Sequence, residues 1–373
     1  MSNPFTTRPV HGGNLVWAAS LSGCSPSDLL DFSASINPLG PPKSAIQAIQ
    51  AHLPQLTVYP DPSYSQLCAE LGEIHGLPPD WILPGNGSAE LLTWAGRDFA
   101  DLAATYLLTP AFGDYSRALS ASGVKVVACP LLEPGGGGVE CGVGGVGLEA
   151  VLAVEGFAPK QCGLLLNNPH NPTGRLFSQE SILPYLDQFA LVVVDEAFMD
   201  FLPPDQRQSL VGQVHHHSNL VILCSLTKFY SLPGLRLGYA IAHPDRLRRW
   251  RQWRDPWPVN VLAAAAAATV LQDQAFQRRS WEWLAIAQPQ LFEGLAQLPG
   301  LRPLPSAVNF LLVACELSSS HLQLQLLKRY RILIRDCLSF PELGDHYFRV
   351  AVRLVSENQT LIQGLTDILD GSR

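Results

Sequence analysis

The chain has 373 residues, of which 47% are hydrophobic and 15% are charged, and its formal net charge at pH 7 is −7. This length suits one to three domains, and the apolar content suits a large buried core and excludes an intrinsically disordered chain. The negative balance gives no global attraction for nucleic acids, and no apolar run approaches the roughly 20 residues that span a membrane.

Taken in chain order, the pattern predicts three parts. Residues 1–49 are punctuated by proline and glycine and are expected to form an arm that packs against the C-terminal domain. Residues 50–265 are expected to form a large domain, and residues 266–373 a smaller α+β domain.

Short apolar runs alternate with helix-compatible stretches between about residues 78 and 244. Such runs are typical of strands buried on both faces in a covered, mostly parallel sheet. Their alternation with helices predicts an α/β fold for the large domain. The runs are 104–109, 124–131, 163–167, 191–198, 219–225 and 237–242.

A glycine-rich segment, residues 133–147, interrupts this alternation. Glycine loses more conformational freedom on folding than any other residue, so we interpret the segment as a mobile surface loop. A phosphate-binding loop is the alternative, but no helix follows closely enough to complete such a site.

The arginine-rich segment 246–254 is predicted to be the solvated face of an amphipathic helix, because Leu247, Trp250 and Trp253 recur at helical spacing. A nucleic-acid-binding segment is the alternative.

Three consecutive histidines at 215–217 could suggest a metal site. Adjacent side chains of a loop diverge, however, so no metal is predicted.

The eight cysteines include no C-x-x-C pair, and the N-terminus has no apolar segment typical of a signal peptide. These features predict reduced thiols in the core of a cytoplasmic protein.

Beyond about residue 270, long helix-compatible stretches surround short predicted strands at 308–315, 331–337 and 347–354.

The strongest chemical signal is the string S-L-T-K-F-Y-S-L-P-G-L-R-L-G, residues 225–238. A lysine, Lys228, follows the end of an apolar strand. Lysine forms a reversible imine with an aldehyde, and desolvation can lower its pKa enough to leave a free amine. Ser225 and Arg236 would supply a hydroxyl and a bidentate charge for a phosphate nearby. The alternative is an ordinary surface lysine.

Polar residues also follow other predicted strands. Asp195 closes an all-apolar run, where a buried carboxylate is costly unless it is paired; alone, such an aspartate is more often a cap or a metal ligand. Asn171 lies in an N-P-T-G turn. Gly87 and Ser88 open a helix whose free N–H groups suit a phosphate, although a plain helix start is the alternative.

The string at 225–238 resembles the cofactor-attachment motif of the class I and II aminotransferases, and the resemblance extends over nearly the whole chain. It implies fold type I, with a mostly parallel seven-stranded sheet in the large α/β domain and a smaller domain beside it. It also implies pyridoxal 5'-phosphate as the cofactor. Lys228 would hold this cofactor as an imine, and Asp195 would pair with the nitrogen of its ring.

The same resemblance implies the other cofactor contacts. Asn171 would bond the phenolic oxygen of the cofactor, and Phe112 would stack on its ring. The cofactor phosphate would be held by Gly87, Ser88, Ser225 and Arg236. Tyr59, in V-Y-P-D-P, would reach this phosphate from a neighbouring subunit, which implies a homodimer with shared active sites.

Within this superfamily, segments such as H-G-G-N-L (11–15) and R-I-L-I-R-D-C (331–337) resemble the threonine-phosphate decarboxylases of cobalamin synthesis. Histidinol-phosphate aminotransferases are near relatives, but they usually carry tyrosine where Phe198 stands. Ser35 stands where the decarboxylase family has asparagine, so it keeps a hydroxyl but loses reach. The residues implied to touch the substrate are His11, Gly12, Ser35, Asn171, Arg335 and Arg349, with Arg349 on its carboxylate.

The function implied is decarboxylation of L-threonine O-3-phosphate. A histidinol-phosphate aminotransferase is the alternative that uses the same cofactor, and a non-catalytic regulatory module that binds the cofactor is a remote one. The expected partners are a small phosphorylated amino acid and a second copy of the chain, with no nucleic acid and no membrane.

Overall fold

The computed structural model describes residues 8–132, 147–153 and 157–371. The predicted glycine-rich loop lies outside these residues except for Gly147. None of the helices in the described ranges is long and apolar enough to cross a membrane.

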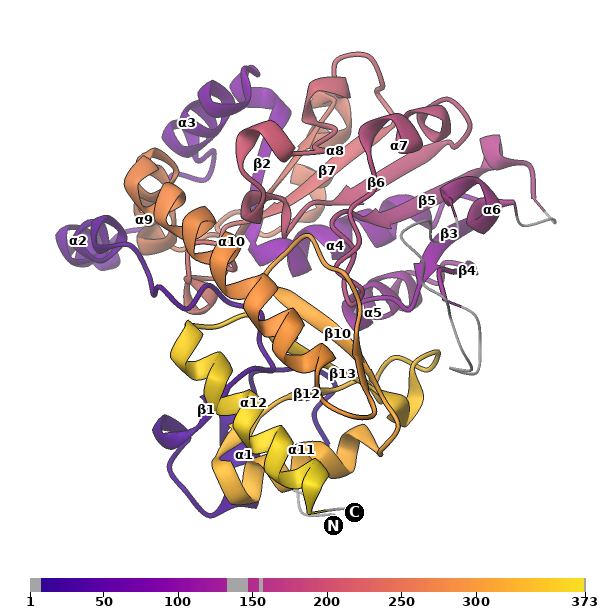
Figure 1. The fold of residues 1–373 in the computed structure, drawn as a ribbon. Coiled ribbons are helices and arrows are strands. Elements are labelled where there is room, and N and C mark those ends of the chain that lie inside the picture. The colour runs from indigo at the N-terminus through magenta and orange to yellow at the C-terminus, as the bar shows by residue number, and fades with distance from the viewer. Residues whose placement is uncertain (1–7, 133–146, 154–156, 372–373) are drawn as a thin grey trace, which may run out of the picture.

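A seven-stranded sheet forms the centre of the large domain, in the order β2-β8-β7-β6-β5-β3-β4 (Figure 1). Strand β8 is antiparallel to both of its neighbours, and every other neighbouring pair is parallel, which confirms the predicted mostly parallel sheet. The strands are β2 (Ile82–Asn86), β3 (Ala104–Thr109), β4 (Val126–Pro130), β5 (Cys162–Asn167), β6 (Leu191–Asp195), β7 (Leu220–Ser225) and β8 (Leu237–Ala242).

Helices cover both faces of this sheet because alternate strand residues point to opposite sides. One face packs against α4 (Gly87–Phe99), α5 (Gly113–Ala121) and α8 (Pro244–Trp253). The opposite face packs into a larger core with residues of α3 (Ser65–His75), α6 (Leu148–Leu152), α7 (Gln179–Leu186) and α9 (Val261–Gln272).

One strand departs from the predicted burial on both faces. Among the described residues, strand β4 pairs only with β3, so it forms an edge of the sheet. Cys129 is its one fully buried residue, whereas Val126 is 40% exposed. The prediction of burial on both faces is therefore wrong for this run, because no strand of the described ranges lies along its outer side.

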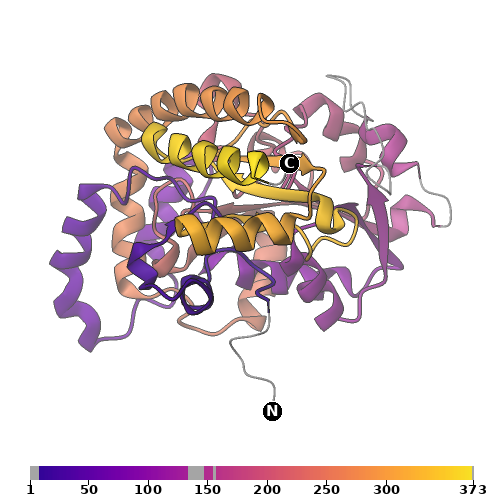
Figure 2. The same cartoon turned by 60° about the horizontal axis from the view of Figure 1, so that its bottom comes forward.

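The C-terminal domain contains a four-stranded antiparallel sheet with the order β12-β13-β10-β9. Helices α10 and α12 run side by side over it (Figure 2). The elements are α10 (Gln274–Ala296), β9 (Leu301–Pro303), β10 (Phe310–Cys315), α11 (Ser319–Tyr330), β11 (Ile332–Leu333), β12 (Arg335–Asp336), β13 (Tyr347–Ala351) and α12 (Val355–Asp370).

The predicted single strand at 331–337 is wrong. It is divided at Ile334 into β11 and β12, which belong to different sheets. Strand β11 pairs in parallel with the N-terminal β1 (Leu30–Asp31), whereas β12 pairs with β13.

The N-terminal segment contacts both halves of the molecule. Helix α1 (Leu15–Ser22) packs on α11, and β1 lies beside β11, among the C-terminal elements in Figure 1. Helix α2 (Lys43–His52) instead packs along α9. The division of the chain at residues 50 and 265 stays a prediction.

The arginine-rich segment forms helix α8, and Leu247 and Trp250 are buried beneath it as predicted. Its arginines are not simply a solvated face. Arg246 and Arg249 form ion pairs with the buried carboxylate of Asp98. These two arginines are partners of Asp98 within the fold, because a buried carboxylate needs cationic partners.

Candidate active site

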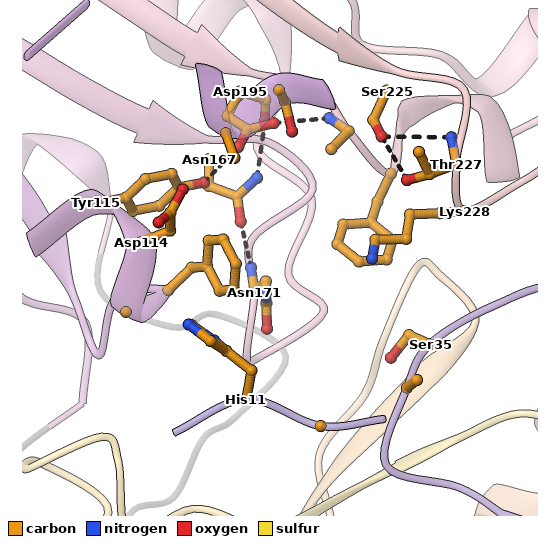
Figure 3. Close-up of a pocket in the computed structure, with 18 of the residues that line it drawn as sticks. His11, Ser35, Asp114, Tyr115, Asn167, Asn171, Asp195, Ser225, Thr227 and Lys228 are labelled. Carbon is orange, nitrogen blue, oxygen red and sulfur yellow. Dashed lines mark hydrogen bonds between the residues drawn. The ribbon is translucent and has the colours of Figure 1, made fainter. Parts of the chain in front are cut away.

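A cavity of about 330 Å³ lies between the large-domain sheet, the N-terminal segment and the C-terminal domain. Figure 3 shows Lys228, Asp195, Asn171 and His11 around this space. Strands β6 and β7 deliver polar residues where they end, while β12 and β13 form the facing wall. The predicted site residues that line it are His11, Gly12, Ser35, Gly87, Ser88, Phe112, Asn171, Asp195, Ser225, Lys228, Arg236, Arg335 and Arg349.

Lys228 lies in the turn that follows β7, and its backbone oxygen accepts a hydrogen bond from the Asn37 amide at 3.1 Å. Burial lowers the pKa of its ammonium from 10.5 to about 8, and the nearby charges of Arg349 and Arg236 add to this effect. In a substantial fraction of molecules the Lys228 amine is therefore uncharged near pH 8. The uncharged amine is the form that attacks an aldehyde.

Asp195 ends β6 with its carboxylate buried. Its Oδ2 accepts a hydrogen bond from the Tyr115 hydroxyl at 2.8 Å, and its Oδ1 accepts one from the Ala197 amide at 2.9 Å. Burial raises the pKa of this carboxyl to about 6, although the Tyr115 hydrogen bond opposes the change. A cationic ring nitrogen in the cavity would offset the cost of burying this charge.

Asn167 links Asp195 to Asn171 (Figure 3). The Asn167 side-chain amide donates to the backbone oxygen of Asp195 at 2.8 Å, and its oxygen accepts from the Asn171 amide at 2.7 Å. This network holds the ends of β5 and β6 in register. Sequence reasoning did not select Asn167 or Tyr115, although Asn167 ends a predicted strand and Tyr115 stands three positions after Phe112.

Helix α4 begins at Gly87, where its first N–H groups face the cavity beside Arg236. Gly87 has a φ of 73°, and a Cβ there would lie 2.6 Å from Nη2 of Arg236, so both the backbone and the space favour glycine. The Ser225 and Thr227 hydroxyls lie 2.8 Å apart on the same side (Figure 3). Thr227 was not predicted, although it precedes the lysine.

These residues fit pyridoxal 5'-phosphate, the group that the sequence resemblance implies. A helix N-terminus, two hydroxyls and a guanidinium suit its phosphate. The amine of Lys228 suits its aldehyde, and the carboxylate of Asp195 suits its ring nitrogen.

Two arginines stand opposite this half of the cavity. Arg335 and Arg349 are register partners on β12 and β13, with only 6% and 8% of their surfaces exposed. Arg349 donates one hydrogen bond to Asn171 Oδ1 and another, of 3.2 Å, to the Ser33 carbonyl. Burial, followed by the charge of Arg335, lowers the pKa of Arg349 to about 10. Two adjacent cations of this kind favour an anionic ligand.

The N-terminal segment closes one side of the cavity. The His11 ring lies 5.5 Å from the Phe112 ring, measured between centroids. A Cβ on Gly12 would lie 2.2 Å from the Ser33 carbonyl oxygen, so this close approach requires glycine. The buried Ser35 hydroxyl has no hydrogen-bond partner among the described residues, so it is available to a ligand.

Tyr59 is the one predicted site residue that does not line this cavity. Its side chain is 77% exposed and stacks on Trp257, with the ring centroids 4.4 Å apart. Its predicted contact with the cofactor of a neighbouring subunit stays a prediction.

Comparisons with known proteins extend over almost the whole chain. The family model described as aminotransferase class I and II matches residues 27–365. The threonine-phosphate decarboxylase of Salmonella typhimurium is 38% identical over 97% of each chain. The histidinol-phosphate aminotransferase 2 of Nitrosospira multiformis is 30% identical over 93% of this chain and 86% of that protein.

A solved structure is also similar. The L-threonine-O-3-phosphate decarboxylase of Porphyromonas gingivalis superposes with a TM-score of 0.77 and 25% identity, over 91% of this chain and 99% of the other.

Proposed function

Since this chain belongs to the aminotransferase class I and II family, we propose that it is a pyridoxal-phosphate-dependent decarboxylase of L-threonine O-3-phosphate. The substrate loses its carboxylate as CO2 and gains a proton at Cα, which gives (R)-1-amino-2-propanol O-2-phosphate. We assign this product to cobalamin biosynthesis.

The observation that carries the proposal is the pair of arginines on one wall of the cavity. Arg335 and Arg349 stand side by side, and both are buried. Threonine phosphate carries a carboxylate and a phosphate on one small molecule, so two adjacent guanidinium groups suit it. The 38% sequence identity to the Salmonella decarboxylase, over nearly the full length of both chains, also favours threonine phosphate as the substrate.

The residues divide the work as follows in this proposal. Arg349 binds the carboxylate and so fixes which bond of Cα is oriented for cleavage. Arg335 and His11 bind the phosphate. Lys228 Nζ would hold the cofactor through its aldehyde and would supply the proton that Cα gains.

When bound, pyridoxal phosphate supplies an electron-withdrawing ring that accepts the electron pair released at Cα. Asp195 would keep a proton on the nitrogen of that ring, and Asn171 would bond its phenolic oxygen. Gly87, Ser88, Ser225 and Arg236 would hold the cofactor phosphate, and Thr227 would join them, since it lines the cavity and its hydroxyl lies 2.8 Å from that of Ser225. Phe198, which packs against Phe201 and Phe310, brings no hydroxyl to the site.

We expect the purified protein to release CO2 from L-threonine O-3-phosphate and to form the amino-alcohol phosphate in equal amount. In parallel, histidinol phosphate with 2-oxoglutarate should give no glutamate. Headspace CO2 and mass spectrometry of the product measure the first reaction, and a glutamate assay measures the second. Transamination of histidinol phosphate without decarboxylation of threonine phosphate would contradict the proposal, and so would inactivity in both assays.

We also propose that the working unit is a homodimer in which Tyr59 serves the cofactor phosphate of the neighbouring subunit. The exposure of Tyr59 and its distance from the cavity of its own chain support this arrangement. Exposed apolar side chains around it, including Val58 and Leu56, would be covered by the second copy.

A cytoplasmic location is proposed as well, since the cysteines of the described ranges are free thiols.

Mixing a Tyr59→Ala chain with a Lys228→Ala chain should restore activity that neither variant has alone. In each mixed dimer, one site receives Tyr59 from one chain and Lys228 from the other. Random exchange should therefore make about a quarter of all sites complete in a two-fold dimer. The measurement is decarboxylase activity after subunit exchange has been verified by native mass spectrometry.

Tyr59→Phe keeps the stacking on Trp257 and removes only the hydroxyl, so it should be impaired as Tyr59→Ala is if that hydroxyl binds the phosphate. An impaired Tyr59→Ala chain that gains no activity in verified mixed dimers would argue against shared sites.

A further inference from the structure

A cluster of three charged residues joins the N-terminal segment to the wall that carries Arg335. Nε of Arg8 lies 2.7 Å from Oδ2 of Asp336, and Nη1 of Arg335 lies 3.5 Å from Oδ1 of the same carboxylate. One carboxylate is thus flanked by two guanidinium groups, one on each oxygen. We call Arg8, Asp336 and Arg335 the arm cluster.

The members of the arm cluster differ in exposure. Only 1% of the Asp336 side chain and 7% of the Arg335 side chain are exposed, against 38% for Arg8. Burial raises the pKa of the Asp336 carboxyl above its ordinary value, and Arg8 and then Arg335 oppose the change. A buried carboxylate is stabilised by whichever cations reach it, because water does not solvate it there.

Arg335 has competing partners. It donates hydrogen bonds to the carbonyl oxygens of Pro9, at 3.2 Å, and Val10, and to the Ser339 hydroxyl. It also borders the cavity, where a substrate anion would need its positive charge. With Asp336 alone beside it, Arg335 would form a neutral pair. With Arg8 added, the arm cluster carries a net charge of +1.

We propose that Arg8 is a positioning residue that neutralises Asp336, so that Arg335 keeps its charge for the phosphate of the substrate. The inference rests on the proposed function, in which a phosphorylated substrate lies against Arg335. Arg8 does not line the cavity itself, so it acts on the substrate only through Arg335. A structural role, in which Arg8 merely ties the arm down, makes a different prediction for a double variant.

Arg8→Ala should raise the KM for L-threonine O-3-phosphate about tenfold, the scale of coupling between charged neighbours, with little change in kcat. Arg8→Lys keeps the charge and should retain most of the affinity. In Arg8→Ala/Asp336→Asn the competing carboxylate is gone, so the KM should return to within a few fold of that of the wild type. If Arg8 only tied the arm down, the double variant would be as impaired as Arg8→Ala.

Phosphoethanolamine separates this inference from the proposed reaction, because it has an amine and a phosphate but no carboxylate to lose. Calorimetric titration should show the same order of affinities for the holoenzyme, with wild type and double variant tight and Arg8→Ala weak. Arg248→Ala, which removes an ion pair with Asp245 at the surface, is the matched control and should bind as the wild type does.

The inference is overturned if Arg8→Ala binds phosphoethanolamine as the wild type does, if the wild type does not bind it, or if the double variant is not rescued while its melting temperature is unchanged. Failure of the wild type to release CO2 from threonine phosphate would instead overturn the proposed function, and the calorimetric comparison would still test Arg8.

Discussion

Replacing Lys228 with alanine is expected to abolish decarboxylation. The substitution removes the amine that is proposed both to join the cofactor aldehyde and to return a proton to Cα. Proton transfer by a positioned side chain alone contributes about 10²–10⁴-fold, so the loss should be at least of this order. The measurement is single-turnover CO2 release from threonine phosphate with saturating cofactor.

Borohydride reduction tests the same residue directly. Reduction of the wild type should fix pyridoxal phosphate to the peptide that contains Lys228, and peptide mapping should find it there. The other lysines, at 43, 125, 160 and 328, are exposed, so Lys160→Ala is the control and should leave both labelling and turnover unchanged. Reduced cofactor on any lysine other than Lys228 would refute the assignment.

A pH series adds a second measurement for Lys228. The pKa of its amine is lowered to about 8 in the cofactor-free protein. The fraction of free amine, and with it the rate at which the protein takes up added pyridoxal phosphate, should therefore rise as the pH passes through about 8.

Replacing Arg349 with alanine is expected to reduce kcat/KM for threonine phosphate by about 30-fold to several thousand-fold, since loss of a buried charge-assisted partner costs about 2–5 kcal/mol. Arg349 also donates to Asn171 Oδ1, so the absorbance of the bound cofactor should change as well. Arg335→Ala should lose activity on the same scale but leave the absorbance unchanged, because its hydrogen bonds reach Pro9, Val10 and Ser339 instead.

Arg302→Ala is the control for both substitutions. Arg302 is an exposed arginine of β9, in the same sheet, and it does not line the cavity. Its replacement should leave steady-state kinetics and absorbance unchanged. Decarboxylation by Arg349→Ala at the wild-type rate would show that the carboxylate is not bound there.

The central strands of the large domain were predictable because each is an apolar run bounded by polar turns. Burial on both faces makes such a pattern continuous, and β5, β6 and β8 are buried along their whole lengths. The run that became β4 is similarly apolar, but edge and central positions depend on strand order. Strand order is a property of the assembled sheet, and the residues of a single run do not indicate it.

The split of residues 331–337 was unpredictable for a related reason. Leu333 and Arg335 are two positions apart, yet one strand pairs with β1 and the other with β13. Those partners come from opposite ends of the chain. The ion pairs of Arg246 and Arg249 could not be predicted for the same reason, because their partner Asp98 lies about 150 positions earlier in the sequence.

The site divides along similar lines. Lys228, Asp195 and Asn171 could be selected because each follows a strand within a recognisable string, and one cavity brings them together. Tyr115 acts through its hydroxyl, and Ser33 through its backbone carbonyl oxygen, on residues that are adjacent only after folding. Nothing in the local sequence distinguishes Tyr115 from other tyrosines, and a backbone carbonyl is present at every position.

The parallel pairing of β1 with β11 has a consequence for how the protein is made. Leu30 pairs with Ile332, and about 300 residues of synthesis at about 5–20 residues per second take about 15–60 s. During that interval the emerging N-terminal segment lacks its strand partner, and Trp17 lacks Leu327 and Leu333, on which it later packs. The wall that carries Arg349 is translated later still. The cofactor can therefore be captured in the finished cavity only after Arg349 has left the ribosome, and until then the ribosome-bound N-terminus exposes apolar surface of the kind that chaperones bind.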